Sequence, residues 1–454
     1  MTVQAIAGLR SEAADMRRGA CPTLGQPMRT GDGLLARLRP EDCRLTLAQL
    51  RALAHAASEF GNGIVEVTAR GSLQIRGLRP ETVRPLEEAV FNYGIMPATG
   101  LMVEVPPLAG IDPEELIDPR PIAQEIRQLV AAHRPLLVLA PKLAVTVDGG
   151  GRLHLGAVIA DVRLTAIDEQ RFLLALGGDN ASARKVAVVP SDRVAPAVLR
   201  VLEAVAALGP AARGREVDLA ALDGLHDPAA SDIAVPTQVR SFLGVQAMQA
   251  GHGFAAACTL GIGFPYRQAR AADLIAFLDD VEISGLSDIR LSPGHGIVLT
   301  GLHHAQASRA EDVARRHGFW TSPHEPRARI SLCAGRSGCA SAHFDTRAAA
   351  EAVSRHAPLL LDGSISVHLS GCQKGCAHPS AAAVTLVGAP SGYALVVNGS
   401  ASHSPALYIA ANDLETALAR LASLVAGAKE ADEEARDCLA RIGLVAIVAA
   451  LDLP

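Results

Sequence analysis

Apolar and polar positions alternate in the same way in two distant segments of the chain, residues 64–78 and 288–302. Alternation with a period of two is typical of half-buried strands, and each segment has glycine near its middle, so each is predicted to form a β-hairpin. The apolar positions of the two segments coincide at an offset of 224 residues: Val65 with Ile289, Val67 with Leu291, Leu73 with Ile297 and Ile75 with Leu299.

The neighbouring elements are repeated in the same order. A helical pattern precedes each hairpin, at residues 45–59 and 271–281. Further pairs follow downstream: residues 107–110 with 332–335, helical stretches 121–132 with 347–356, and strands 143–149 with 365–371. One hairpin can match by chance, whereas several elements in one order indicate a duplication. We predict two α+β copies, at about residues 20–230 and 231–454, with a linker near 209–232 and an N-terminal arm at 1–19.

Composition excludes several classes of protein. The 454 residues carry a net charge of −5 and only 3% aromatic residues, which argues against nucleic-acid binding. The longest apolar run, residues 442–451, is shorter than the about 20 residues of a membrane span. The polar start lacks the core of a signal peptide, so we expect a cytoplasmic protein with reduced thiols. Arginine supplies 38 of the 42 basic residues, which indicates a G- and C-rich genome or a substrate with several carboxylates.

Four of the eight cysteines stand in two close pairs. Five residues separate Cys333 from Cys339, and three separate Cys372 from Cys376, in segments that contain glycine. Such a set suits a [4Fe–4S] cluster, because thiolates are soft iron ligands and glycines let backbone N–H groups approach the sulfurs. A zinc site, a catalytic thiol with His378 as its base, and unrelated buried thiols are the alternatives. The other cysteines are expected to be structural: Cys21, Cys43, Cys258 and Cys438.

This cysteine pattern, in a duplicated α+β chain, resembles the siroheme-dependent nitrite and sulfite reductase family. The segments VTARGSLQIRGL (67–78) and LAPKLAVTVDGG (139–150) also resemble strands of that family. The resemblance covers residues from about 20 to 430. It implies that all four cysteines ligate a [4Fe–4S] cluster, and that Cys376 also bridges to the iron of a siroheme.

The resemblance also implies a domain organisation. Two ferredoxin-like half-domains, 20–80 and 231–305, would pair into one module. Two α+β domains of the nitrite and sulfite reductase type, 81–230 and 306–454, would flank a central tetrapyrrole and cluster site. The second of these domains would carry the iron–sulfur cluster.

The chain departs from the reductases where they bind their small anion. Arg70 matches one family arginine and Lys142 the first of two lysines. Ala144 stands in place of the second lysine, and Leu101 falls where a second arginine is expected. Each missing charge-assisted contact costs ~1.5–3 kcal/mol of anion binding. Reduction of a small anion is therefore not favoured.

Three segments, 18–40, 140–151 and 261–268, instead resemble a branch of the family that acts in aerobic cobalamin biosynthesis. Members of that branch are oxygen-dependent monooxygenases, which hydroxylate precorrin-3A and close a lactone. The resemblance implies precorrin-3A and O2 as substrates, and a [4Fe–4S] cluster that passes electrons, with or without siroheme or a further iron centre. An electron-donating reductase or a ferredoxin would be the partner, NADH the indirect electron source, and a monomer the expected state.

The resemblance and the residue types single out a set that would contact the tetrapyrrole: Arg70, Gln74, Arg76, Lys142, Lys374 and His378. Arg70 and Lys142 are also the candidate catalytic residues. Arg70 and Arg76 would share a strand face if the turn does not intervene. Lys142 stands in an apolar run, where an unpaired charge is costly. The alternatives are a solvated strand edge for the arginines and a structural role for His378.

Other functions stay open. A siroheme-dependent ferredoxin nitrite or sulfite reductase is the main alternative, and a zinc-stabilised binding protein without catalytic activity is another. The sequence GHGFAA at 251–256 matches a dinucleotide-binding motif in form. No strand–turn–helix unit surrounds it, so we do not predict a nucleotide-binding fold.

Overall fold

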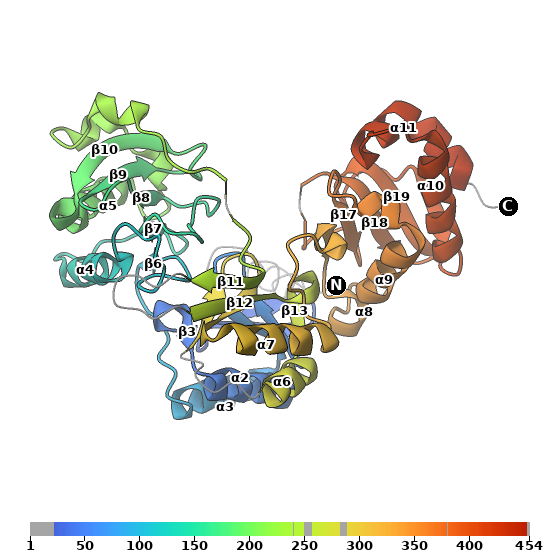
Figure 1. Ribbon diagram of the computed structural model, residues 1–454, viewed down its shortest axis with the longest axis horizontal. Coiled ribbons are helices and arrows are strands. Elements are labelled where there is room, and N and C mark those ends of the chain that lie inside the picture. The colour runs from blue at the N-terminus through green and yellow to red at the C-terminus, as the bar shows by residue number, and fades with distance from the viewer. Residues whose placement is uncertain (1–21, 239, 249–256, 282–287, 379, 452–454) are drawn as a thin grey trace, which may run out of the picture. The chain divides into compact units, whose positions relative to one another are not determined.

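The computed structural model describes residues 22–238, 240–248, 257–281, 288–378 and 380–451. The expected arm at 1–19, Cys21 and the motif at 251–256 lie outside these ranges. The chain divides into two compact units (Figure 1). Unit 1 comprises the chain up to Met28 together with Leu34–Pro323, and unit 2 comprises Arg29–Gly33 together with His324–Pro454.

Two related five-stranded sheets each take one edge strand from the other half of the chain. The first has the order β1 (Met28–Thr30), β2 (Gly33–Leu38), β5 (Leu73–Leu78), β4 (Ile64–Val67) and β13 (Gln268–Arg270). The second has the order β11 (Gly244–Met248), β12 (Ala257–Gly263), β15 (Gly296–Leu302), β14 (Ile289–Ser292) and β3 (Arg44–Leu45). Strand β13 pairs with β4, and β3 pairs with β14, so the two halves exchange strands.

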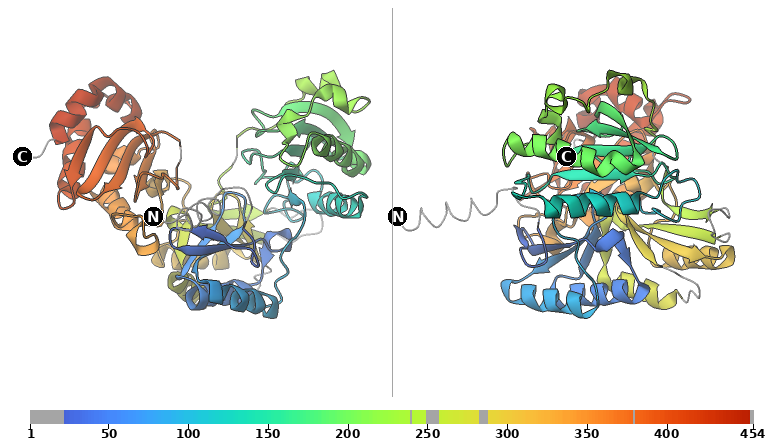
Figure 2. Two further views of the ribbon diagram at one scale, coloured as in Figure 1. Left: turned by 180° about the vertical axis from the view of Figure 1, so that it is seen from behind. Right: turned by 90° about the vertical axis from the view of Figure 1, so that its left-hand side faces the viewer.

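These two sheets share one hydrophobic core with the helices that cover them. The helices are α2 (Leu47–Phe60), α3 (Pro80–Asn92), α6 (Ala271–Asp280) and α7 (His304–Arg316). In α2 the buried residues Leu50, Leu53 and Ala57 recur at helical spacing and pack into the same core as Leu274 and Phe277 of α6. Figure 2 shows the blue and yellow elements of the two halves next to one another. Because both halves contribute to one core, they fold as one module.

The duplication extends to the backbone conformation. Left-handed φ angles recur at positions related by the same offset of 224 residues: Cys43 and Arg267 (53° and 71°), Gly71 and His295 (72° and 73°), and Gly77 and Gly301 (71° and 76°). A non-glycine residue pays a steric cost for such an angle, so its retention at Arg267 and His295 reflects a fixed turn geometry. The predicted duplication of an α+β unit is confirmed.

The other two sheets also resemble each other. One has the order β10 (Arg184–Pro190), β9 (Arg171–Leu176), β8 (Val162–Ala166), β7 (Ala144–Asp148) and β6 (Met102–Glu104). The other, in unit 2, has the order β16 (Ile330–Leu332), β17 (Val367–Ser370), β18 (Ala382–Ala389), β19 (Gly392–Gly399) and β20 (Leu407–Ala410). In each sheet three neighbouring strands are parallel and the remaining pairs antiparallel.

Helices complete both α+β sheets. Helices α4 (Pro119–Ala132) and α5 (Val194–Ala207) pack into the core of the β6–β10 sheet. Unit 2 has the one-turn helix α8 (Gly335–Gly338) and the longer helices α9 (Thr346–His356), α10 (Leu414–Ala428) and α11 (Ala435–Leu451). Among the described residues no helix is both long and apolar enough to cross a membrane.

Candidate iron–sulfur and tetrapyrrole site

The two cysteine pairs follow adjacent parallel strands of unit 2. Cys333 comes directly after β16, and Cys372 comes two residues after β17. The register of these strands places Leu332 opposite Leu369. Because parallel strands end at the same edge of a sheet, the two cysteine loops emerge side by side. The sheet therefore brings together sequence positions that are almost 40 residues apart.

Backbone N–H groups approach the sulfur of Cys333. The N–H of Gly371 donates to Cys333 Sγ at 3.1 Å. Burial raises the pKa of the Cys333 thiol, the N–H groups of Gly371 and Gly335 lower it, and the nearby thiols of Cys339 and Cys372 raise it further. Two of the other predicted ligands, Cys339 and Cys372, therefore lie within electrostatic reach of Cys333. N–H donors to sulfur are what an anionic iron–sulfur cluster requires of its loops.

Cys376 lies at the exposed end of the second loop, next to Gly375, whose φ is +60°. Among the described residues, no three His, Cys, Asp or Glu side chains lie at the spacing of ligands to a single metal ion. A cube-shaped cluster holds its four cysteines farther apart than a single ion does. The donor chemistry and the N–H groups of this edge therefore fit a cluster of that kind.

The first cysteine loop leads into helix α9, which begins at Thr346. The helical stretch predicted at residues 347–356 is therefore confirmed. The one-turn helix α8 precedes Cys339, and the Thr346 hydroxyl donates to the backbone oxygen of Cys333 at 2.7 Å. Helix α9 begins at this point because Asp345 caps it, accepting from the N–H groups of Arg347 and Ala348.

A buried histidine lies behind the second cysteine loop. His368 on β17 is fully buried, and neither of its ring nitrogens has a hydrogen-bond partner among the described residues. Burial, with His378 beside it, lowers the pKa of His368 to about 4. The two rings are 5.6 Å apart, and Nδ1 of His378 donates to the Ser380 carbonyl at 2.9 Å. The sequence analysis missed His368, although a histidine inside the apolar run before Cys372 was the available signal.

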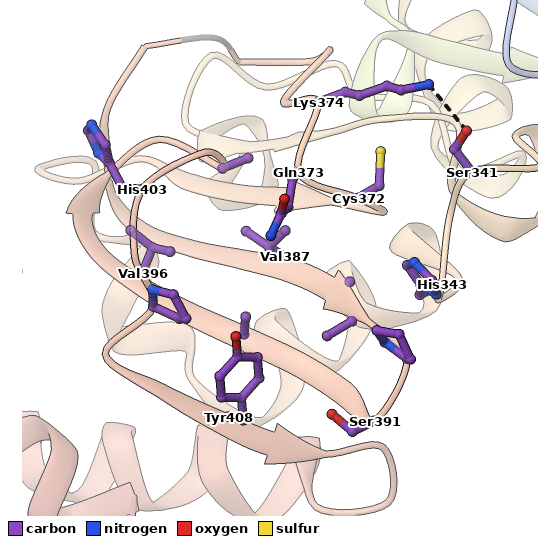
Figure 3. A pocket seen from close by; sticks show the side chains of 16 residues that line it. Ser341, His343, Cys372, Gln373, Lys374, Val387, Ser391, Val396, His403 and Tyr408 are labelled. Atoms are coloured by element: carbon purple, nitrogen blue, oxygen red, sulfur yellow. Dashed lines mark hydrogen bonds between the residues drawn. The ribbon is translucent and has the colours of Figure 1, made fainter.

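A hollow of about 500 Å³ opens beside Cys372 on the sheet of unit 2 (Figure 3). Val387, Ala394 and Val396 form an apolar cluster that lines it. Lys374, whose Nζ donates to Ser341 Oγ at 3.3 Å, lines the same hollow. Two histidines, His343 and His403, add polar groups to the lining, and none of the described lining side chains is acidic. A partly apolar ligand that carries anionic groups fits this lining.

The predicted residues of the first hairpin separate into two environments. Arg70 lies in the turn between β4 and β5, where it forms an ion pair with Glu104 of β6 at 2.7 Å and donates to the Ile159 carbonyl. Burial raises the pKa of Glu104, while Arg70 opposes this shift. Arg76 lies on β5 and pairs with Glu66 instead. Arg70 and Arg76 were expected to share a strand face only if the turn did not intervene, and that condition is not met, because Arg70 lies in the turn.

Gln74 belongs to a row of polar side chains across four strands. Arg37 on β2 lies opposite Gln74 on β5, Gln74 lies opposite Glu66 on β4, and Glu66 lies opposite Gln268 on β13. Arg37 donates to Gln74 Oε1 at 2.7 Å. Gln74 and Gln268 each donate to a Glu66 oxygen, at 2.6 and 2.9 Å. The sequence analysis missed three members of this row, since only strand pairing brings them together.

Lys142 does not lie in a buried strand, contrary to expectation. It is exposed in the turn before β7, which begins only at Ala144. Its backbone oxygen accepts from Arg213 at 3.3 Å. Ala144 itself is fully buried, and its N–H donates to Asp161 at 3.0 Å. Ala144, which the resemblance matches to the second reductase lysine, is thus a buried position on β7.

Comparison with known proteins identifies the family. A model of the nitrite/sulfite reductase ferredoxin-like half domain matches residues 26–90. A precorrin-3B synthase of Sinorhizobium sp. is 46% identical over 98% of this chain and 97% of its own length. A ferredoxin–nitrite reductase of Synechococcus elongatus is 27% identical over 78% of this chain and 76% of its own length.

A solved structure has the same fold. The Mycobacterium tuberculosis NirA protein superimposes with a TM-score of 0.64 at 19% identity, over 91% of this chain and 84% of its own. The expected architecture, with ferredoxin-like half-domains and α+β domains of the reductase type, is therefore confirmed. The chain belongs to the nitrite and sulfite reductase family, and within that family to the precorrin-3B synthases.

Proposed function

We propose that this enzyme hydroxylates precorrin-3A and closes a lactone on it, as a step of cobalamin biosynthesis. The observation that carries this proposal is the 46% identity to a precorrin-3B synthase over nearly the whole of both chains. One oxygen atom of O2 enters the product and the other leaves as water. That balance takes two electrons and two protons from an external donor, for which NADH through a reductase or a ferredoxin is our candidate.

Cys333, Cys339, Cys372 and Cys376 would hold a [4Fe–4S] cluster. When bound, this group supplies electron transfer toward the reacting tetrapyrrole. The protein's part is to hold the sulfurs and to donate N–H groups to them, and the contact from Gly371 to Cys333 supports that role. Siroheme or a further iron centre beside Cys376 belongs to the same proposal.

The substrate would be held through its carboxylates. Lys374 lines a hollow beside Cys372 whose described lining has no acidic side chain. Arg70 and Lys142 remain the candidate catalytic residues, and Arg70 keeps 29% of its side chain exposed while paired with Glu104. Gln74 and Arg76 are tied to Glu66, so we propose that they act by keeping the sheet face rigid. His378 would position the second cysteine loop through its contact with Ser380.

Ferredoxin-dependent reduction of nitrite or sulfite is the second candidate. The 27% identity to a nitrite reductase over 78% of this chain favours it. Ala144 argues against it, because a buried alanine supplies no charge to a small anion.

The decisive experiment is turnover of precorrin-3A by protein purified without oxygen and replete in iron and sulfide. With ¹⁸O2 and a reductant we expect a product that contains one ¹⁸O atom, detected by mass spectrometry. Cys376→Ser should abolish both the iron–sulfur absorption and the product, whereas Cys258→Ser, at a buried thiol on β12 of unit 1, should retain them. Recovery of unchanged precorrin-3A, together with viologen-linked reduction of nitrite, would replace this proposal with the reductase.

A further inference from the structure

A short segment from near the N-terminus lies against the first cysteine loop. Residues 29–33, which we call the tip segment, belong to unit 2 although 290 residues separate them from the rest of that unit. The N–H of Ala340 donates to the Gly31 carbonyl at 3.0 Å. The tip segment forms a turn that the Thr30 hydroxyl stabilises, since this hydroxyl lies 2.6 Å from Asp32 Oδ1 and 2.9 Å from the Gly33 carbonyl oxygen.

Gly31 contacts Cys339 so closely that no side chain fits between them. A Cβ atom placed on Gly31 would overlap the sulfur of Cys339 and lie 3.5 Å from its Cβ. The φ angle of Gly31 is outside the left-handed region, so its backbone suits any residue. The need for glycine at this position is therefore a need for space beside a sulfur, not for an unusual backbone angle.

We propose that the tip segment is a positioning element of the cluster site, which covers Cys339 and fixes its sulfur through Gly31. This inference rests on the cluster proposed above. Cys339 is half-buried, whereas Cys376 is exposed. Solvent access affects the potential and persistence of an iron–sulfur cluster, so a backbone cover over one ligand protects the cluster as a whole.

The test compares Gly31→Ala with Gly427→Ala, each of which adds one methyl group. A Cβ on Gly427, in helix α10, would meet no atom within 4 Å, so this variant is the matched control. After anaerobic reconstitution we expect Gly31→Ala to hold less iron and acid-labile sulfide per chain than the wild type. Its iron–sulfur absorption should also bleach several-fold faster in air, while Gly427→Ala matches the wild type in each measurement.

A second measurement uses the metal-free chain and needs neither cluster nor substrate. Iodoacetamide should alkylate Cys339 more slowly than Cys376 in the wild type, as followed by peptide mass spectrometry. In Gly31→Ala this difference should shrink. Thr30→Val, which keeps Gly31 but removes the hydroxyl that closes the turn, should shift the ratio in the same direction.

The proposal would be overturned if Gly31→Ala matched the wild type in iron content, in bleaching rate and in the protection of Cys339 from alkylation. If Gly31→Ala lowers the urea midpoint of the whole chain, the variant Thr30→Val becomes the test of the proposal. An unchanged ratio of Cys339 to Cys376 alkylation in Thr30→Val would then overturn the proposal as well. Neither measurement depends on precorrin-3A. If precorrin-3A is not turned over, the proposed function fails, but the role of the tip segment can still be tested.

Discussion

Glu66 joins three polar side chains on the first sheet. Its oxygens accept from Gln74 and Gln268, and Arg76 pairs with it at 3.3 Å. The carboxylate is buried, so loss of its charge would weaken hydrogen bonds that water cannot replace. Since Gln268 comes from the second copy, this one residue also ties the two halves together.

Replacement of Glu66 by glutamine should lower the free energy of unfolding by about 2 kcal/mol. The amide would put a donor where an acceptor is needed and would remove the negative charge that pairs with Arg76. Urea denaturation checks this result. Glu88→Gln, in an exposed pair with Arg84, should cost less than about 0.5 kcal/mol, and an equal loss in both variants would contradict the argument.

His295 should make the protein sensitive to acid. Burial, with Arg267 beside it, lowers the pKa of His295 to about 4, although Nδ1 donates to the Val67 carbonyl at 2.7 Å. The unfolded chain takes up a proton below pH 6.5, whereas the folded chain does so only near pH 4. Stability is therefore lost as the pH falls through this window, by about 2 kcal/mol between pH 7 and pH 5.

Urea midpoints at pH 7 and pH 5 measure this effect, with His295→Asn as the comparison. Asparagine tolerates the left-handed φ of 73° at this position and does not titrate. The variant should show a smaller loss of stability on acidification than the wild type. Equal slopes in the two proteins would show that other groups cause the acid sensitivity.

The N-terminus of helix α9 is connected to the first cysteine loop by hydrogen bonds. Asp345 caps α9, and Thr346, its first residue, holds the Cys333 carbonyl. Asp345→Ala should destabilise unit 2 by about 1 kcal/mol, because two N–H groups lose their acceptor. Asp345→Asn, which retains an acceptor oxygen, should behave like the wild type in thermal denaturation. A larger loss with asparagine than with alanine would rule out capping as the cause.

The helices and strands were largely predictable from the sequence, but the pairing between strands was not. The hairpin at 64–78 appears as β4 and β5, and the hairpin at 288–302 as β14 and β15. Alternating burial determines such strands locally. The exchange of β3 and β13 between the halves was not foreseen, because short edge strands carry little periodic signal and their pairing depends on packing from both copies.

For the molecule as a whole, the proposed binding of a carboxylated tetrapyrrole has to overcome a net charge of −5. Local cations must supply the attraction, and dissolved salt screens them. The affinity for uroporphyrin, a stable polycarboxylate tetrapyrrole, should therefore fall as salt rises from 50 to 500 mM, by roughly tenfold. Isothermal titration measures this dependence, and an affinity independent of salt would contradict it.

Lys374 provides the residue-specific form of the same prediction. Lys374→Gln should weaken uroporphyrin binding by up to about fivefold, which corresponds to an exposed charge contact. Lys429→Gln removes the same charge elsewhere in unit 2, where it pairs with Asp362, and should leave binding unchanged. If both variants weaken binding equally, the hollow beside Cys372 is not the site.

The sequence by itself determined the duplication, the α+β class and the two cysteine pairs, because periodicity and ligand spacing are local properties of the chain. Only the tertiary structure decided which groups face one another. It placed Gly31 against Cys339, Arg37 beside Gln74 and Arg70 beside Glu104. Such contacts join residues distant in the chain, and they depend on strand register and on the space left between packed elements, which no local pattern encodes.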